Sequence, residues 1–182
     1  MSARPLLGLV LIVAMGSGCN ARTGPGTLEA VIEPQGETAG FGNFSTGRDK
    51  SFGVFVCTRD GSVELESITP MHTEGDVEFL GARVYVSPDR YVGAAHGFPP
   101  DGIDESRIEP FAETVIESDC DAPPGDERVQ LLVGAERTGS GGGVVDGFVV
   151  QTTGGELEIP FTILLCGDRM EYCEVLEPAD GG

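Results

Sequence analysis

Apolar and polar residues alternate along several short stretches of the chain. The clearest is 156–165 (ELEIPFTILL), in which every second residue from Leu157 to Leu165 is apolar and Glu156 and Glu158 hold the other parity. A period of two predicts a strand with one buried face. Pro160 lies on the outward parity, and proline cannot donate a hydrogen bond to a neighbouring strand, so we expect an edge strand here.

Other stretches repeat or modify this pattern. Residues 129–136 (VQLLVGAE) and 63–68 (VELESI) alternate in the same way. Residues 76–86 (DVEFLGARVYV) change parity after Phe79, and Gly81 lies where a β-bulge could absorb the change. Further strands are expected at 28–33, 52–57 and 144–151, with a two-residue hairpin turn in 153–156 (TGGE).

Helical spacing is scarce outside 103–118, where Asp104 followed by 107–117 could form one short helix interrupted by Pro110. Seven or eight one-sided strands with glycine-rich turns predict a single antiparallel β-sandwich, because each strand needs a second sheet to cover its apolar face. The layout is similar to immunoglobulin-like and fibronectin-like domains. The resemblance is architectural, since the chain has no Trp and has Leu164 where a tyrosine corner would place Tyr.

The N-terminus has the order of an export signal. Arg4 precedes the uncharged apolar run 6–15 (LLGLVLIVAM), which is too short to span a bilayer, and small residues lead to Cys19. This order resembles the lipoprotein signal of bacteria, which implies a cysteine acylated with chains such as palmitate that becomes the first mature residue. Gly16 departs from the pattern, which usually has a branched apolar residue there. An ordinary signal peptide cut near Gly18 is the alternative.

Cysteine counting bears on that choice. Removing Cys19 leaves an even set that can pair fully in an oxidising compartment: Cys57, Cys120, Cys166 and Cys173. We expect Cys57 to pair with Cys120 and Cys166 with Cys173, and the rival is Cys57 with Cys166. The expected organisation is a signal peptide (1–18), a lipidated cysteine and tether (19–27), the sandwich domain (28–176) and a disordered tail (177–182).

The charge balance limits the partners. The chain has 30 acidic and 11 basic residues, a formal charge of −19, and loss of Arg4 with the leader makes it −20. Such a surface repels nucleic acid and anionic lipid, so the membrane link is expected through the lipid anchor alone. As a whole the chain looks like the small uncharacterised lipoproteins of GC-rich bacteria.

Motifs for catalysis are not recognisable. The stretch 138–143 (TGSGGG) is not followed by a phosphate-loop lysine, so we expect a mobile hairpin loop there. His72 and His96 are far apart and have no zinc-site spacing. Acidic residues of 119–127 (DCDAPPGDE) are weak calcium candidates that do not fit the calcium-loop template: Asp119, Asp121, Asp126 and Glu127.

These observations predict a lipid-anchored module on the extracytoplasmic face of the cell membrane that binds or supports an envelope protein or cell-wall component, with no catalysis and no cofactor. The alternatives are a calcium-dependent adhesion or ligand-binding module and an envelope hydrolase with a nonstandard site. Tyr91 and Phe98, in the most apolar loop-like stretch, are the candidate binding residues. The competing interpretation is that both rings pack over the end of the core.

Overall fold

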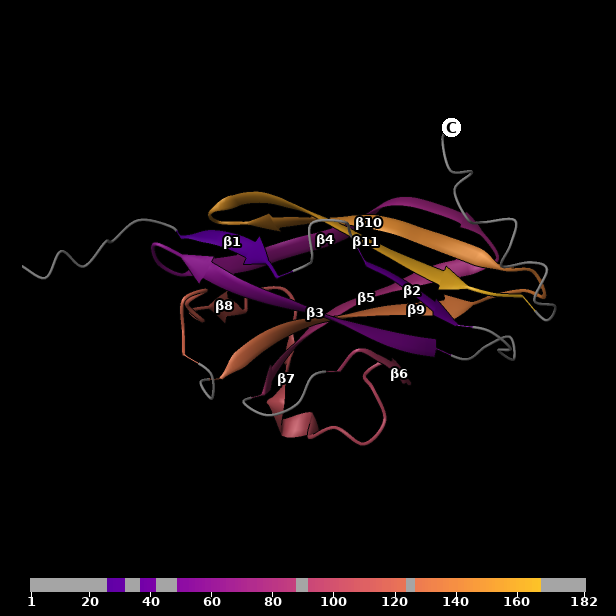
Figure 1. Ribbon diagram of the computed structural model, residues 1–182, viewed down its shortest axis with the longest axis horizontal. Coiled ribbons are helices and arrows are strands. Elements are labelled where there is room, and N and C mark those ends of the chain that lie inside the picture. The colour runs from indigo at the N-terminus through magenta and orange to yellow at the C-terminus, as the bar shows by residue number, and fades with distance from the viewer. Residues whose placement is uncertain (1–25, 32–36, 42–48, 88–91, 124–126, 168–182) are drawn as a thin grey trace, which may run out of the picture.

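The fold is that of an all-β sandwich, seen in a computed structural model as two sheets packed face to face (Figure 1). The structure describes residues 26–31, 37–41, 49–87, 92–123 and 127–167. The predicted fold class is confirmed. Within the described residues, no helix is long and apolar enough to cross a membrane.

The first sheet has the strand order β1-β3-β9-β5-β7, and its neighbouring strands are antiparallel. A further short strand, β6, pairs with the first part of β3. The strands of this sheet are β1 (Thr27–Ala30), β3 (Asp49–Arg59), β9 (Arg128–Arg137), β5 (Val77–Ser87), β7 (Ile108–Pro110) and β6 (Ala94–His96).

The second sheet has the order β2-β11-β10-β4-β8. It is antiparallel except at β2, which runs parallel to β11. Its strands are β2 (Glu37–Phe41), β11 (Gly155–Leu165), β10 (Gly143–Thr152), β4 (Val63–Gly75) and β8 (Val115–Ile116).

The inner faces of the two sheets form one apolar core. In β11 the predicted alternation is confirmed, since Ile159, Phe161, Ile163 and Leu165 are buried and the glutamates between the first apolar positions are exposed. Across the sandwich the ring of Phe52 in β3 lies 6.2 Å from that of Phe161, centroid to centroid. Burial of these side chains on both inner faces is the main apolar contribution to stability.

Three local predictions can be compared with the structure. The register of β5 shifts between Phe79 and Gly81, and Gly81 has φ 103°, which confirms the bulge. The β10–β11 turn is a two-residue turn, but Thr152 pairs with Gly155, so it begins one residue earlier than expected. The prediction that β11 is an edge strand holds only up to Pro160, because β2 pairs with β11 from Phe161 onward.

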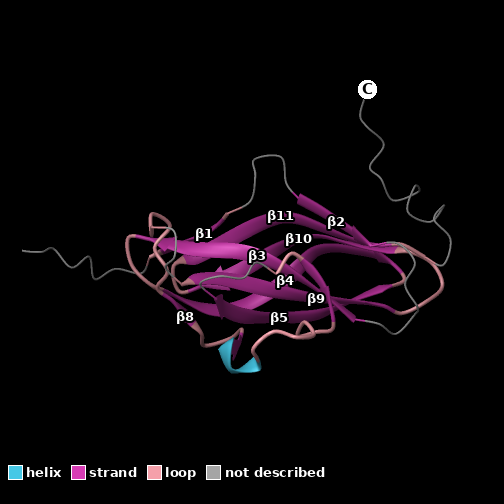
Figure 2. Ribbon diagram, turned by 60° about the horizontal axis from the view of Figure 1, so that its bottom comes forward, coloured by secondary structure: helices cyan, strands magenta, loops and turns pink. Residues whose placement is uncertain are grey.

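The short helix that 103–118 could form, interrupted at Pro110, is absent from this described stretch. The segment contains the 3-10 turn η1 (Glu105–Arg107) and the short strands β7 and β8. Pro110 pairs with Arg83 at the end of β7, and Glu113 has φ 69°, so the backbone reverses where a helix would continue. Figure 2 shows η1 and its flanking loops against the outer side of β5.

This segment changes the outer face of the first sheet. Leu132 of β9 points outward by parity, yet it is fully buried with Tyr85 and Val92 in a second apolar cluster, which Ile103 and Ile108 border. Gln130 is also buried, and its Oε1 accepts a hydrogen bond from the Val92 amide at 2.9 Å. The prediction that β9 is half-buried is therefore wrong, because residues between 92 and 108 cover its second face.

Candidate functional site

An open hollow of about 790 Å³ lies where β3 begins and β6 ends. Charged residues and the loop after β6 line it: Asp49, Lys50, Ala95, His96, Gly97, Phe98, Pro99 and Asp101. The hollow therefore contains one of the two predicted binding residues, Phe98. The other, Tyr91, lies outside the described residues.

Lys50 and His96 are held together by strand pairing. They are direct partners in the β3–β6 ladder, and the amine of Lys50 hydrogen-bonds His96 Nδ1. Lys50 is the only lysine in the chain and is 1% exposed, whereas His96 is exposed. An ammonium can only donate, so in this contact Lys50 is the donor and His96 Nδ1 is the acceptor.

The loop after β6 is fixed to both strands by hydrogen bonds. The Phe98 amide donates to Asp49 Oδ2 at 2.7 Å, and the Asp101 amide donates to the carbonyl of His96 at 2.8 Å. The Ser51 hydroxyl also donates to the carbonyl of Gly97. These contacts hold Asp49, Asp101 and His96 in the lining of one preformed hollow.

Phe98 packs on the sheet in addition to lining the hollow. A Cβ atom added to Gly134 of β9 would lie 2.5 Å from the Phe98 ring, so the ring rests directly on this glycine. The interpretation that Phe98 packs over the sandwich therefore fits the structure. Sequence reasoning found this residue through its apolar loop, but it missed His96 and Lys50, which only the short β6 strand brings together.

The lining defines what the hollow can bind. Asp49 and Asp101 offer acceptor oxygens, His96 offers an imidazole, and Phe98 offers an aromatic ring. Carboxylates recognise hydrogen-bond donors and cationic groups, and an aromatic wall adds apolar contact. This combination suits recognition of a polar group that carries amines, amides or hydroxyls.

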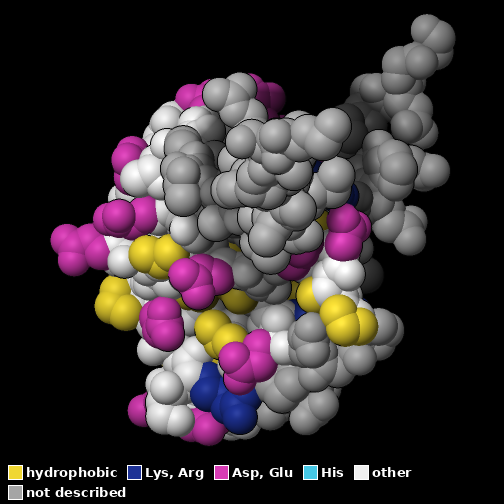
Figure 3. Space-filling model, turned by 90° about the vertical axis from the view of Figure 1, so that its left-hand side faces the viewer, with side chains coloured by type: hydrophobic (Ala, Val, Ile, Leu, Met, Phe, Trp, Pro, Cys, Tyr) yellow, Lys and Arg dark blue, Asp and Glu magenta, His cyan; other side chains and the backbone are white. Residues whose placement is uncertain are grey.

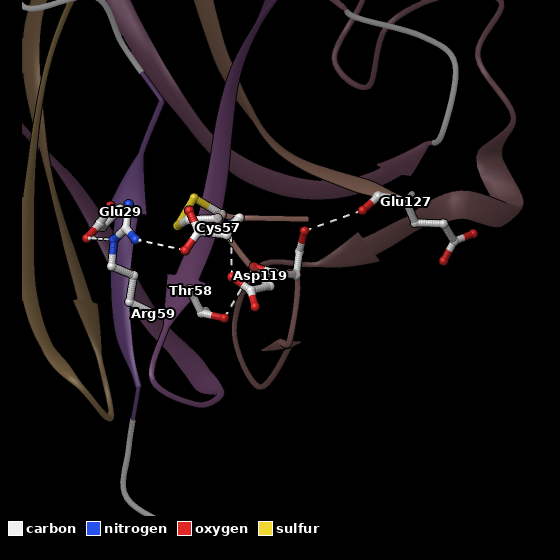
Figure 4. Close-up of a disulfide and its surroundings, with 9 residues drawn as sticks. Glu29, Cys57, Thr58, Arg59, Asp119 and Glu127 are labelled. Atoms are coloured by element: carbon white, nitrogen blue, oxygen red, sulfur yellow. Dashed lines mark hydrogen bonds and ion pairs between the residues drawn. A yellow bond between two sulfur atoms is a disulfide. The ribbon is translucent and has the colours of Figure 1, made fainter. Parts of the chain in front are cut away.

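The disulfide lies at the other end of β3, where the chain crosses between the sheets (Figure 4). Cys57 and Cys120 are bonded with a Cα–Cα distance of 4.9 Å, which confirms the first of the two expected pairs and rules out Cys57 with Cys166. The Thr58 amide donates to Ser118 at 2.7 Å, and the Cys120 amide donates to Thr58 at 3.2 Å. Cys166 is also disulfide-bonded, and the predicted partner Cys173 lies outside the described residues.

Three of the four calcium candidates, Asp119, Asp121 and Glu127, make local contacts beside this disulfide (Figure 4). Asp119 Oδ1 accepts the Asp121 amide at 2.9 Å, and Asp121 Oδ2 lies 3.3 Å from Arg59 Nη1. Arg59 also pairs with Glu29 at 2.7 Å, and the hydrogen bond from Arg59 to Glu29 is the main reason that the pKa of Arg59 is raised. Glu127 accepts from the Ser118 hydroxyl through its backbone carbonyl.

No metal centre is formed in the part of the chain that the structure describes. There, no group of three or more His, Cys, Asp or Glu side chains is placed to hold a metal ion, and Asp126 lies outside that part. Figure 3 shows this end of the sandwich, where Asp and Glu side chains are spread between small apolar patches. The acidic loop contributes hydrogen bonds and one ion pair to the fold around the disulfide.

The glycine-rich loop between β9 and β10 has a partner that the sequence did not reveal. The Gly141 amide donates to Asp76 Oδ2 at 2.7 Å, and the Asp76 backbone bonds Thr138 and Gly142. Added Cβ atoms at Gly139 and Gly141 would lie 2.2 and 2.9 Å from this carboxylate. The predicted hairpin is wrong, because β9 and β10 belong to different sheets and the stretch connects them. It folds around a carboxylate of the same chain, which occupies a place that a bound anion could take.

Comparison with known proteins assigns no family. No family model matches the chain, and no curated protein matches it. The chain is similar to the VesB protease of Vibrio cholerae with 11% identity and a TM-score of 0.34, over 80% of this chain and 33% of that one. It is similar to the CooA pilin subunit of enterotoxigenic Escherichia coli with 13% identity and a TM-score of 0.32, over 79% of this chain and 99% of that one. The chain thus spans about a third of the length of the protease.

Proposed function

We propose that this protein is a lipid-anchored β-sandwich on the extracytoplasmic face of the membrane that binds or supports another envelope component without catalysis of its own. The observation that carries the proposal is the Cys57–Cys120 disulfide. Disulfides persist in oxidising compartments, which fits a chain whose N-terminus resembles a lipoprotein signal ending at Cys19.

The hollow beside β6 is the proposed binding surface. Asp49 and His96 lie on paired strands, and the hydrogen bonds of Asp101 and Phe98 hold the loop that completes the hollow. A preformed polar hollow loses little conformational entropy on binding. The proposed ligand is an envelope protein or cell-wall component that presents amine, amide or hydroxyl donors to the two carboxylates.

The anchor is tested by replacing the acylated residue. Cys19→Ser removes the thiol that accepts the lipid, so the full-length protein should move from the membrane fraction to the soluble fraction, and its intact mass should lose the lipid increment. Ser17→Ala keeps the thiol and is the matched control. Unchanged membrane partition of Cys19→Ser would contradict the anchor.

The hollow is tested with a substitution that spares the packing of Phe98. Asp101 is exposed, so Asp101→Asn should leave the fold intact while reducing capture of a crosslinked envelope partner several-fold. Glu158→Gln on the second sheet makes the same charge change away from the hollow and should capture normally. Equal capture by the two variants would contradict the site, and turnover of an envelope substrate by the purified protein would contradict the binding function.

A further inference from the structure

The second sheet leaves most of one edge strand without a partner. β8 pairs only with Val63 and Glu64 of β4, and the backbone of Leu65 bonds Thr114 and Glu113. From Glu66 to Gly75, no described segment hydrogen-bonds to the outer side of β4. Unpaired N–H and C=O groups along such an edge are a template for a further strand.

Other margins of the sandwich are better protected. The edge of β3 is shared by β1 and β6, and the edge of β5 is closed by β7 beyond the bulge at Gly81. On β4 the register against β10 shifts between Leu65 and Ser67, at the start of the open stretch, and Pro70 removes one donor farther along. These two interruptions limit indiscriminate pairing. The β4 edge is therefore the longest strand margin that the described residues leave open.

The sheet that carries this edge has several acidic side chains and one histidine, His72 of β4, whose Nε2 lies 3.3 Å from Glu74 Oε2. Its five strands contain no Lys or Arg, whereas β3, β5 and β9 of the first sheet contain five. Its described acidic side chains are all exposed: Glu64, Glu66, Glu74, Asp146, Glu156 and Glu158. A segment that docks along the described part of this sheet meets mainly acidic side chains, and the exception is His72 beside Glu74.

The edge also offers apolar contact. Met71 lies in the middle of the open stretch, is 54% exposed, and rests over Gly147 of β10. Thr69 and Thr73 flank it, and β-branched side chains favour an extended backbone. An added strand would cover Met71 while its backbone completes the ladder.

We propose that the open edge of β4, from Glu66 to Gly75, accepts an extended basic segment of another protein as an additional strand of the second sheet. Backbone hydrogen bonds supply the affinity, and the acids select the charge of the segment. A second copy of this chain is disfavoured because Glu66 and Glu74 would face further acids. The inference depends neither on the lipid anchor nor on the hollow.

The test uses the full-length protein and a capped ten-residue peptide of alternating lysine and valine. Its control is the same peptide with N-methyl groups on two successive central residues. Because successive amides of a strand point to opposite edges, this removes one hydrogen-bond donor from each edge of the peptide and leaves its charge unchanged. Hydrogen exchange measured by NMR should show at least ten-fold slower exchange of the outward amides between Ser67 and Gly75 with the first peptide alone. Equal affinity for both peptides, or no slowing in β4, would overturn the proposal.

Charge variants separate this edge from general attraction to an acidic protein. The double variant Glu66→Lys, Glu74→Lys should weaken peptide binding at least ten-fold. The matched control is Glu105→Lys with Glu127→Lys, which changes the net charge by the same amount at exposed positions in η1 and just before β9. This control should bind the peptide as tightly as the unmodified protein does. Equal weakening by both pairs would overturn the proposal, as would concentration-dependent dimerisation through β4 in sedimentation experiments.

Discussion

The outer faces of the two sheets differ although their inner faces look alike. On the first sheet, Gln130 and Leu132 of β9 are fully buried under residues between 92 and 108. On the second sheet, Glu156 and Glu158 of β11 are exposed at equivalent outward positions. The comparison shows that the character of the outward residues, in addition to the alternation itself, indicates whether a sheet face is covered.

The covered face depends on close backbone approach. At Gly53 of β3, an added Cβ would lie 1.9 Å from the carbonyl oxygen of Val92, and Gly134 plays the same part under Phe98. On the second sheet, Thr69 and Thr73 point into solvent and need no such clearance. Substitutions can therefore test whether the first sheet loses more stability than the second.

The largest effect is expected where the disulfide ties the crossing segment to the first sheet. Replacing Cys57 and Cys120 together by Ala releases a link across a sequence separation of 63. Loop entropy assigns this link about 4 kcal/mol of unfolding free energy. Urea denaturation should show this loss, and a loss below about 1 kcal/mol would mean that the hydrogen bonds of Thr58 hold the crossing alone.

The next effect separates the two outer faces directly. Gly53→Ala places a methyl group against the Val92 carbonyl, a backbone atom that cannot move aside cheaply, and should cost about 3 kcal/mol. Thr69→Ala on the open edge is the control and should change stability by less than about 0.5 kcal/mol. Thermal denaturation of both variants checks this, and similar costs would contradict the difference between the faces.

Phe98 and Met71 extend the same comparison to apolar side chains. Phe98 is half-buried on Gly134, so Phe98→Ala should cost about 2 kcal/mol, below the range for fully buried rings. Met71 is 54% exposed, and Met71→Ala should cost less than about 0.5 kcal/mol. Chemical denaturation that ranked Met71 above Phe98 would show that the cover contributes little.

Much of this fold could be predicted from the sequence. Alternation located the long strands, and the parity change at Phe79 located the bulge. The preference for a local Cys166–Cys173 pair left Cys57 to pair with Cys120. Each of these features has a signal in a short stretch of sequence. The segment that covers the outer face of the first sheet has none, because β6 and β7 have three residues each and are too short to show an alternation of apolar and polar residues.

The candidate site was only partly predictable for the same reason. Phe98 was visible as an apolar residue in a loop, but the Lys50–His96 contact joins residues 46 positions apart through a three-residue strand. A signal existed in 129–136, where the outward residues Gln130, Leu132 and Gly134 are uncharged. The contact between Asp76 and the glycine-rich loop could not be predicted, because the sequence of a glycine run is the same whether or not its amides bind a carboxylate.

A smaller effect is expected at Asp76, whose side chain holds the loop that connects β9 of the first sheet to β10 of the second. Asp76→Ala removes the carboxylate that accepts the Gly141 amide and leaves that donor exposed to water, so it should cost about 1 kcal/mol. Amide exchange across 138–142 should become faster. Unchanged exchange would show that the backbone bonds of Asp76 are sufficient, and Glu158→Ala is the control on the uncovered face.

The smallest effect concerns Asp104, at the start of η1 in the cover of the first sheet. Hydrogen bonds from the Ser106 hydroxyl and amide hold its pKa below the usual range, and Arg107 adds to this. Because the folded pKa is the lower one, this contribution to stability is present above the unfolded pKa and is lost as the pH falls through the folded pKa. In an NMR titration of the side-chain carboxyl, Ser106→Ala should return the pKa of Asp104 toward its ordinary value. An unchanged pKa in that variant would show that Ser106 does not fix η1, and the cover would then rest on its apolar contacts alone.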